Sequence, residues 1–385
     1  MKKPISITAI SSLSALGSEP EKIWEVYKTN NHYLQQRKAA NGGSWVAALP
    51  KESQELVKNL RLEDDYLDLD NSVIFALLVS RNAVKNANWK SEVNFGVNFG
   101  SSRGATTLFE KYHQTYLEKG TSETLSSPTT TLGNISSWVA QDLKSKGPDI
   151  SHSITCSTGL HSLLNGVAWL QSGMSDKFLI GASEAALTPF TIAQMKALRV
   201  YSKEKDLFPC KALDLSKRQN TMVLGEGAVA VCLENEISGK TIALISGIGY
   251  ATEKLEHSAS ISAEANCFQD SMKMALQNHD ASDVDVIITH TPGTIQGDLS
   301  EIKAIEKVFG DNLPAITTNK WKLGHTFATS GLLSLEMAIL MLQKQEFIPV
   351  PYLEKQKRPS KIQNILVNAV GFGGNAVSVL VSLPN

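Results

Sequence analysis

The stretch that decides the fold is SITCSTGLHSLLNG, residues 153–166. Its single cysteine, Cys156, lies among small polar residues where an expected strand gives way to an expected helix. The apolar residues that follow, Leu160, Leu163 and Val167, recur at helical spacing. Cys156 therefore precedes a helix N-terminus, where unpaired backbone N–H groups and the helix dipole favour an anion and lower the pKa of a thiol. We interpret it as a nucleophile, with a buried structural cysteine as the alternative.

Outside this stretch, helix-like and strand-like patterns alternate along the chain. Apolar residues recur at helical spacing in 71–84, 133–143, 298–310 and 331–345, whereas short apolar runs typical of strands cover 5–10, 94–100, 177–182, 228–234 and 283–290. This alternation predicts an α/β protein built around a central sheet. The first run, ISITAI, follows two lysines but is too polar for the core of a signal peptide, so we predict a strand there. The helix 331–342 is apolar on nearly every side, so we expect it to be buried.

A weak internal echo divides the chain. GEGAVAVCL, residues 225–233, is similar to GGNAVSVLV, residues 373–381, and each segment closes a long stretch of alternating elements. We therefore predict two similar halves, 1–235 and 236–385, that meet near residues 234–241.

Composition excludes several classes of function. The chain has 385 residues, 42 % of them apolar, and a formal net charge of −1, so nothing indicates nucleic acid or an anionic membrane surface as a partner. No apolar run is long enough to span a membrane. The four cysteines show no paired spacing, so we expect no metal and no disulfide, and free thiols fit a cytoplasmic protein.

Two of the eight histidines stand out as partners for a cysteine nucleophile. His290 ends a predicted strand and enters the turn TPGT. His325 lies in KWKLGHTFATSGLL, just before the predicted buried helix. Chemistry in α/β proteins concentrates where strands meet loops and helix starts, so these positions suit a site that includes Cys156.

Four segments stand in a fixed order along the chain: ITCSTGLHS, HTPGTIQGDLSE, NKWKLGHTFATSG and VGFGGNA. They resemble the four signatures of the β-ketoacyl-(acyl carrier protein) synthases of the condensing-enzyme class, and the resemblance spans nearly the whole chain. It implies the thiolase fold, in which two related halves form a layered α-β-α-β-α architecture.

The resemblance assigns roles to single residues. Cys156 matches the acyl-accepting nucleophile, and His290 and His325 match the two histidines of the decarboxylating site. Lys320 and Glu301 match the lysine and the acidic residue that accompany them; they either orient the histidines or form a structural ion pair.

Further matches lie at the glycine-rich end and at the loop of the first histidine. Phe372 matches the phenylalanine whose backbone N–H shares the oxyanion hole and whose ring gates the pocket. Thr294, Gly371 and Gly373 complete the expected substrate-binding set.

The implied reaction is a decarboxylative Claisen condensation in fatty-acid, polyene or polyketide synthesis. An acyl chain arrives as a thioester on the phosphopantetheine arm of acyl carrier protein and passes to Cys156. Malonyl carrier protein then loses CO2, two histidine N–H donors stabilise the enolate, and the carbanion attacks the acyl-cysteine. No metal and no dissociable cofactor is needed.

Several departures from the family pattern point to a divergent member. The usual HGTxT motif is HTPGT, with Thr291 and Pro292 replacing a glycine and a threonine. Proline fixes φ and removes a donor, so we expect a reshaped loop near His290. Asn-Ala follows GFGG where Thr-Asn is usual, and Leu213-Asp214 replaces an aromatic-aspartate pair.

Three alternatives remain. A non-catalytic chain-length subunit of a heterodimeric synthase resembles active synthases but typically lacks the cysteine, which is present here. A thiolase or an initiating synthase acts on coenzyme A esters, but the Cys-His-Asn set of initiating synthases is not matched. A cysteine peptidase is expected to carry a single catalytic histidine.

The family also implies partners. We expect a homodimer, or a heterodimer with a paralogous subunit. Carrier proteins are acidic, so a basic patch is expected near the entrance, with Lys203, Lys205, Lys217 and Arg218 as candidates.

Overall fold

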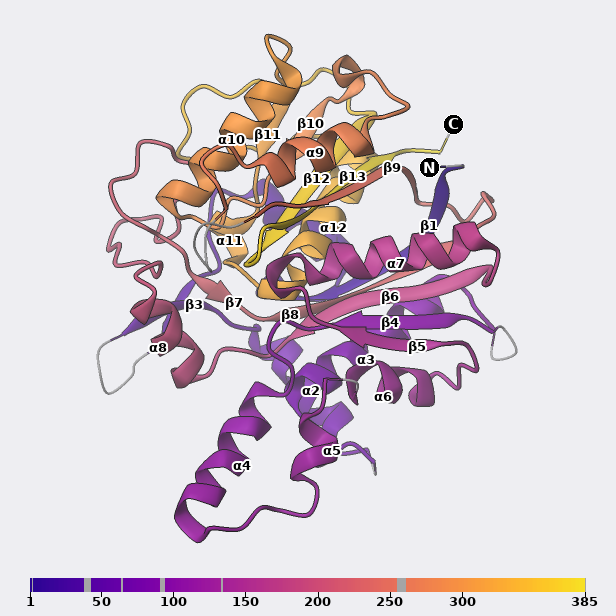
Figure 1. Ribbon diagram of the computed structural model, residues 1–385, viewed down its shortest axis with the longest axis vertical. Helices are drawn as coiled ribbons and strands as arrows, with labels where there is room; N and C mark the ends of the chain where they lie inside the picture. The colour runs from indigo at the N-terminus through magenta and orange to yellow at the C-terminus, as the bar shows by residue number, and fades with distance from the viewer. Residues whose placement is uncertain are drawn as a thin grey trace.

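The computed structural model describes residues 1, 3–37, 43–63, 65–90, 94–132, 134–254 and 261–384. A large mixed sheet runs through its centre (Figure 1). Its strands are β1 (Ile5–Leu13), β4 (Gly96–Gly100), β5 (Asp149–His152), β6 (Lys177–Glu184), β8 (Gly227–Glu234), β9 (Ala243–Thr252), β10 (Val286–Ile288), β11 (Ala315–Thr317), β12 (Asn364–Gly371) and β13 (Asn375–Ser382). A small second sheet joins β2 (Gln35–Arg37), β3 (Ser44–Ala47) and β7 (Leu224–Gly225).

The large sheet contains the same five-strand pattern twice. Its order is β11-β10-β12-β13-β9-β1-β8-β6-β4-β5, so each half places its own strands in the order third, second, fourth, fifth, first, counted along the chain. The directions of the strand pairs agree as well. In the first half, β4 is parallel to β5 and β6, and β8 is antiparallel to β6 and β1. In the second half, β10 is parallel to β11 and β12, and β13 is antiparallel to β12 and β9. The echo in the sequence falls on β8 and β13, which hold equivalent places. The prediction of two similar halves is confirmed.

Helices separate the two halves of the sheet and cover their outer faces. They are α1 (Pro20–Lys28), α2 (Lys51–Arg61), α3 (Asn71–Asn86), α4 (Thr106–Lys119), α5 (Ser126–Thr130), α6 (Asn134–Asp142), α7 (Thr158–Ser172), α8 (Pro189–Ala197), α9 (Asn266–Ala275), α10 (Ile295–Phe309), α11 (Lys320–Leu323) and α12 (Ser330–Lys344). In Figure 1, α3 and α6 cover one outer face, α9 and α10 the other, and α7 and α12 lie between the halves. This is the predicted layered α-β-α-β-α architecture.

The sequence patterns explain why these elements form. In α12 the residues from Ser330 to Leu342 are all buried, as the absence of a polar face predicts. α3 is preceded by Asp70, whose side chain accepts a hydrogen bond from the Ser72 N–H at 2.8 Å and caps the helix. The predicted strand 283–290 is shorter than expected: β10 ends at Ile288, and the next residues form a loop.

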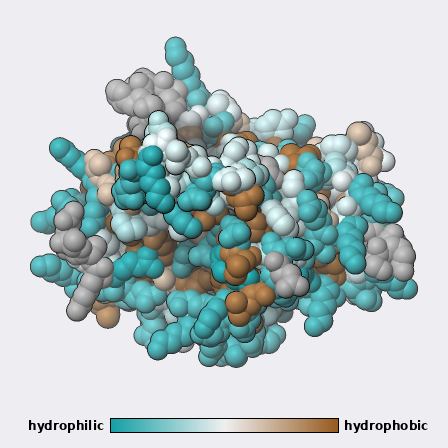
Figure 2. Space-filling view, turned by 90° about the horizontal axis from the view of Figure 1, so that it is seen from below, coloured by the Kyte–Doolittle hydropathy of each residue, from teal (hydrophilic) through white to brown (hydrophobic). Residues whose placement is uncertain are grey.

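The helices α4 and α5 form a hairpin that projects from the body of the molecule (Figure 1). In α4 only Thr106 is buried, whereas Phe109, Tyr116 and Leu117 are more than half exposed. Figure 2 views the side toward which the hairpin projects and shows hydrophobic patches among hydrophilic residues. The described part of the chain therefore leaves apolar side chains of this hairpin uncovered. No helix in the described residues is long and apolar enough to cross a bilayer.

Glu336 gives the fold a measurable pH dependence. It lies in α12 with 3 % of its surface exposed, and burial raises its pKa to about 7. Because this pKa exceeds the ordinary value of about 4.3, the folded state holds the proton more tightly than the unfolded chain does. The contribution of Glu336 to the free energy of unfolding is therefore present in full below about pH 4, and it is lost as the pH rises from there through 7.

We therefore expect Glu336→Gln to raise the free energy of unfolding at pH 8 by about 1–3 kcal/mol, and at pH 5 by roughly a third of that amount. Urea unfolding of both proteins at the two pH values measures this. An equal difference between variant and wild type at pH 5 and pH 8 contradicts the assignment.

Candidate active site

Cys156 lies in a single 3-10 turn that leads directly into α7. The preceding residue, Thr155, has a left-handed backbone with φ 48°, which is rare for a β-branched residue. The Thr155 carbonyl accepts hydrogen bonds from the hydroxyls of Ser102 and Thr158, each at 2.6 Å. The Thr155 hydroxyl donates to the carbonyl oxygen of Phe372 at 3.2 Å. These contacts hold a strained turn that presents the sulfur at the N-terminal end of α7.

The pKa of the Cys156 thiol differs from the sequence-based expectation. Burial, together with a smaller effect of the charge of Glu184, raises it to about 12. A hydrogen bond from the Phe372 N–H and the charges of Lys320 and Arg103 lower it, but less than burial raises it. The predicted lowering is therefore wrong, because desolvation outweighs the helix terminus. Cys156 rests as a neutral thiol and must release its proton when it attacks.

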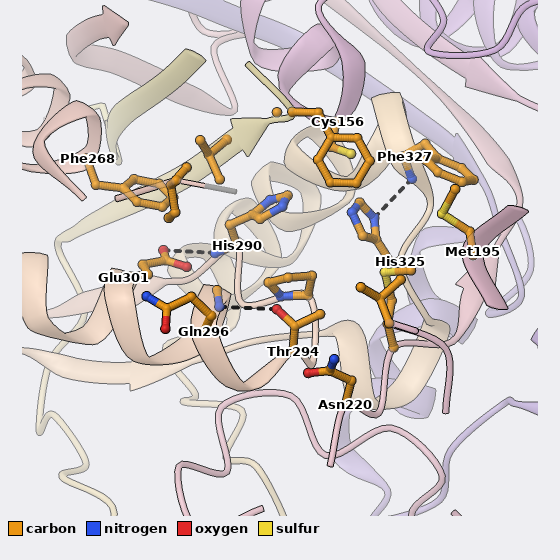
Figure 3. A pocket seen from close by; sticks show the side chains of 18 residues that line it. Cys156, Met195, Asn220, Phe268, His290, Thr294, Gln296, Glu301, His325 and Phe327 are labelled. Atoms are coloured by element: carbon orange, nitrogen blue, oxygen red, sulfur yellow. Dashed lines mark hydrogen bonds between the residues drawn. The ribbon is translucent and has the colours of Figure 1, made fainter. Parts of the chain in front are cut away.

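Figure 3 shows the cavity of about 200 Å³ into which Cys156, His290 and His325 point. Its wall is mostly apolar, and the segments that form it come from both halves of the chain. It is lined by Cys156, Met195, Val200, Asn220, Met222, Ile261, Phe268, His290, Pro292, Thr294, Gln296, Gly297, Glu301, His325, Phe327, Val370, Gly371 and Phe372. The structure thus brings together the cysteine and the two histidines that the sequence singles out.

His325 follows α11, and its neighbours fix the orientation of its imidazole ring. Its Nδ1 accepts a hydrogen bond from the Phe327 backbone N–H at 3.1 Å and lies 2.9 Å from Ser330 Oγ. Since a backbone N–H can only donate, Nδ1 is unprotonated, and the neutral ring carries its proton on Nε2. Burial and the nearby charge of Lys320 lower the pKa of His325 to about 3. His325 is therefore a neutral hydrogen-bond donor in the cavity wall.

His290 lies in the loop after β10. Its ring meets that of His325 edge to face, with centroids 5.2 Å apart and planes at 87°. Burial, followed by the charges of His325 and Lys320, lowers the pKa of His290 well below its ordinary value. Its Nδ1 is buried without a hydrogen-bond partner among the described residues. Both histidines are thus neutral at physiological pH.

Glu301 holds the loop that carries His290. Its carboxylate, on α10, accepts hydrogen bonds from the backbone N–H groups of His290 at 2.9 Å and Thr291 at 2.8 Å, and from the Asn368 side-chain amide at 3.2 Å. Burial raises the pKa of Glu301 to about 7. Its direct contact is with the backbone of the loop, although it also lines the cavity.

Lys320 lies behind the cavity and does not line it. Its Nζ donates to Asn319 Oδ1 at 3.1 Å and to Ser334 Oγ at 3.5 Å. Burial lowers the pKa of Lys320 to about 8, while the charge of Glu301 opposes this shift. Lys320 and Glu301 thus interact through their charges and not through a shared hydrogen bond.

The glycine-rich end approaches Cys156 closely. A side chain at Gly371 would lie 2.1 Å from Thr155 Oγ1, so only glycine fits between this strand end and the turn. Phe372 is 41 % exposed and lines the cavity. Gly373, with φ 106°, does not line it, whereas Thr294 lines it and caps α10 by accepting the Gly297 N–H at 3.2 Å.

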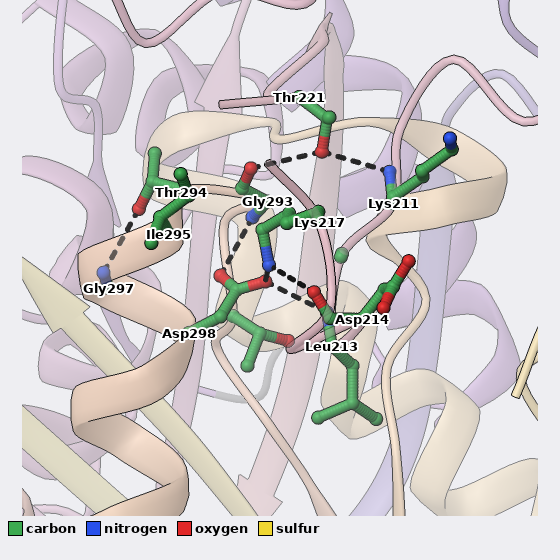
Figure 4. A network of polar contacts seen from close by, with 12 residues as sticks. Lys211, Leu213, Asp214, Lys217, Thr221, Gly293, Thr294, Ile295, Gly297 and Asp298 are labelled. Carbon is green, nitrogen blue, oxygen red and sulfur yellow. Dashed lines mark hydrogen bonds and ion pairs between the residues drawn. The ribbon is translucent and has the colours of Figure 1, made fainter. Parts of the chain in front are cut away.

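The prediction that Lys217 belongs to a basic surface patch is wrong. Its side chain is only 1 % exposed and pairs with the fully buried Asp298 at 2.7 Å (Figure 4), so it is not a surface docking residue. The sequence could not show this, because an isolated lysine in a polar segment is usually solvated. Lys203, Lys205 and Arg218 are exposed.

Several cavity residues were missed by sequence reasoning. Met195, Met222, Phe268 and Phe327 give the cavity much of its apolar wall, yet they come from separate segments with no common motif. Asp298 carried a weak signal, since it lies three residues before Glu301 on one helix face. The described residues contain no group of three or more histidine, cysteine or acidic side chains placed to hold a metal ion.

Known proteins match this chain over its full length. Residues 2–237 match the β-ketoacyl synthase N-terminal domain, and residues 242–354 match the β-ketoacyl synthase C-terminal domain. A 3-oxoacyl-[acyl-carrier-protein] synthase 2 of Coxiella burnetii is 26 % identical over 409 residues, covering 99 % of each chain.

Solved structures share the fold. The ishigamide ketosynthase/chain length factor has a TM-score of 0.88 at 17 % identity and covers 100 % of both chains. A type II polyketide synthase ketosynthase, in complex with its acyl-carrier protein and bound to the hexaketide, has a TM-score of 0.84 at 19 % identity, covering 99 % of this chain and 100 % of its own.

Proposed function

Because the chain belongs to the β-ketoacyl synthase family, we propose that its cavity joins an acyl group held on Cys156 to a two-carbon unit from malonyl carrier protein. The chain is accordingly an acyltransferase of the condensing type, acting in fatty-acid or polyketide synthesis. The observation that carries the assignment of roles is the cavity shared by one buried thiol and two neutral imidazoles.

In the first step, the Cys156 sulfur attacks the carbonyl carbon of an acyl thioester. The thiol gives up its proton, the S–C bond to the enzyme forms, and the phosphopantetheine thiol leaves with a proton. The Phe372 N–H is near enough to the sulfur to lower the pKa of the thiol, so we propose that it also serves as a donor to an oxyanion on the adjacent carbon. The apolar wall provided by Met195, Met222 and Phe327 suits the acyl chain.

In the second step, malonyl carrier protein loses CO2. The electron pair of the broken C–C bond becomes an enolate, whose oxygen accepts hydrogen bonds from His290 and from Nε2–H of His325. The nucleophilic carbon then attacks the acyl-Cys156 carbonyl, a C–C bond forms, and the bond between that carbonyl and the sulfur breaks. The sulfur leaves with the bonding electron pair as a thiolate and takes up a proton from water to restore the thiol. Neutral imidazoles suit this task, because they donate without a charge that would bind the malonyl carboxylate and oppose its loss.

We assign Glu301 and Lys320 to orientation of the histidines and to the local charge balance, and Thr294 and Gly371, which line the cavity, to substrate binding. Gly373, which was also expected to bind substrate, is not among the lining residues. The substrates travel on the phosphopantetheine arm of acyl carrier protein, and Lys203, Lys205 and Arg218 remain predicted contacts for that acidic partner. We place the enzyme in the cytoplasm, since its four cysteines are free and buried. The boundary between the halves near residue 235 stays a prediction.

We also infer a dimer, either of two copies or with a paralogous subunit. A chain that serves only as a chain-length subunit would need a partner to supply the nucleophile. This chain retains its own cysteine at the helix terminus, which favours the catalytic role.

The test is an assay of the purified protein with malonyl carrier protein and acyl donors of graded chain length, followed by intact mass. We expect the acyl mass to appear on the protein when malonyl carrier protein is omitted, and a β-ketoacyl product two carbons longer when it is added. A protein that takes up no acyl group alone, but raises the activity of an added synthase, would be a chain-length subunit.

A further inference from the structure

The two histidines of the cavity are held in different ways. The imidazole of His325 is anchored by the Phe327 N–H and by Ser330 Oγ. The imidazole of His290 has no such anchor in the described part of the chain, since its Nδ1 is buried and unpartnered. The position of the His290 ring therefore depends on the backbone of its own loop and on packing against His325.

That loop is held by α10 on one side. Glu301 accepts the N–H groups at its start, and Asp298 Oδ1 accepts the N–H of Gly293 at 3.0 Å. Pro292 lies between these anchors and offers no donor. The backbone of Gly293 has φ 89°, which another residue would adopt only with strain.

The other side of the loop is held by the N-terminal half of the chain. The Gly293 carbonyl accepts hydrogen bonds from the Thr221 N–H at 2.8 Å and the Thr221 hydroxyl at 3.0 Å. The Ile295 N–H donates to Asn220 Oδ1 at 2.9 Å. We call the residues 213–221 the clamp segment, because Asn220 and Thr221 supply these contacts and the preceding residues connect them to α10 (Figure 4).

Lys217 joins the clamp segment to α10. Its Nζ donates to Asp298 Oδ2 at 2.7 Å and to the Asp214 carbonyl at 2.8 Å, and Asp298 Oδ2 also accepts the Leu213 N–H at 2.9 Å. The side chains of Lys217 and Asp298 are 1 % and 0 % exposed. If one charge is removed, water therefore cannot solvate the charge that is left. Removing Lys217 leaves a buried carboxylate that must take up a proton or move, and Gly293 is bonded to that carboxylate.

The contacts around Cys156 do not involve the clamp segment. The nucleophile turn is held by Ser102, Thr158 and Phe372. The two steps of the reaction are therefore supported by separate parts of the structure.

We propose that the Lys217–Asp298 pair is a positioning element that places His290 for malonyl decarboxylation and leaves acyl loading on Cys156 largely unaffected. This inference rests on the proposed function. A displacement of His290 by about 1 Å is expected to slow the malonyl-dependent step about 10²-fold.

The experiment compares Lys217→Met with Lys211→Met, a matched control just before the clamp segment whose side chain contacts neither α10 nor the His290 loop in the described contacts. Lys211 also forms an ion pair, with Asp206 at 2.7 Å, but its side chain is 24 % exposed. Two rates are measured for each protein: acylation of Cys156 by an acyl donor, read by intact mass, and release of labelled CO2 from malonyl carrier protein. If Lys217→Met does not fold, the neutral double variant Lys217→Met/Asp298→Asn replaces it, because no lone charge is then buried.

We expect Lys217→Met, or the double variant, to acylate within about threefold of wild type and to release CO2 about 10²-fold more slowly. Lys211→Met is expected to match wild type in both rates. An equal loss in both rates, or no loss in either, overturns the positioning role while the proposed function stands. A wild-type protein that neither acylates nor releases CO2 refutes the proposed function itself.

Discussion

Replacement of Cys156 by alanine is expected to abolish the acyl-enzyme and to lower condensation by at least about 10³-fold, because no second thiol lines the cavity among the described residues. The release of CO2 from malonyl carrier protein should persist in this variant, since enolate stabilisation depends on His290 and His325 and not on the sulfur. Intact mass after incubation with an acyl donor, together with labelled CO2 release, measures both effects.

The matched control for this experiment is Cys232→Ala. Cys232 is a buried free thiol in β8 and does not line the cavity. The Cys232→Ala variant should therefore take up the acyl group on Cys156 as the wild-type protein does. Acyl mass on Cys156→Ala, or none on Cys232→Ala when that variant remains folded, would show that the nucleophile is misassigned.

Much of the fold is predictable from the sequence because its signals are local. The helical spacing of apolar residues locates α3 and α12, and short apolar runs locate β6 and β8. The similar segments 225–233 and 373–381 fall on equivalent strands of the two halves. The helix start after Cys156 is likewise visible in the spacing of leucines. Such signals need no knowledge of what lies across the core.

The electrostatics of the site were less predictable, because they depend on burial. The helix terminus favours a thiolate at Cys156, yet desolvation raises the pKa of that thiol. Lys217 looked like a surface charge, and only the three-dimensional arrangement shows Asp298 against it. Burial is a property of the packed chain, and a single residue in a polar segment does not reveal it.

The high pKa of the thiol constrains the first step. A group whose pKa is about 12 is almost wholly protonated at pH 7, so the proton must leave as the S–C bond forms. The Phe372 N–H, which lowers the pKa of the thiol, stabilises the negative charge that develops in this process. Pre-formed donors therefore matter more here than a stored thiolate.

Replacement of His325 by alanine is expected to lower CO2 release from malonyl carrier protein by about 10²–10³-fold, because one donor to the enolate oxygen is lost. His325→Gln should recover part of this loss, since its amide N–H can reach toward the place of Nε2–H. Measurement of labelled CO2 release in the Cys156→Ala background removes acyl transfer from the comparison.

The same variants test the protonation state of His325. The pKa of His325 is lowered to about 3, so the ring is neutral at every pH above about 4, and its donor is present throughout the range from pH 5.5 to 8.5. Other groups around the cavity, including Glu301 and Lys320, titrate within or near that range, so the rate itself is not expected to be constant. The ratio of wild-type to His325→Gln rates should nevertheless stay level, because both proteins share those groups. A ratio that changes with a midpoint near pH 6.5 would mean that the imidazole acts as a titrating base or as a cation, and enolate stabilisation by a neutral donor would have to be abandoned.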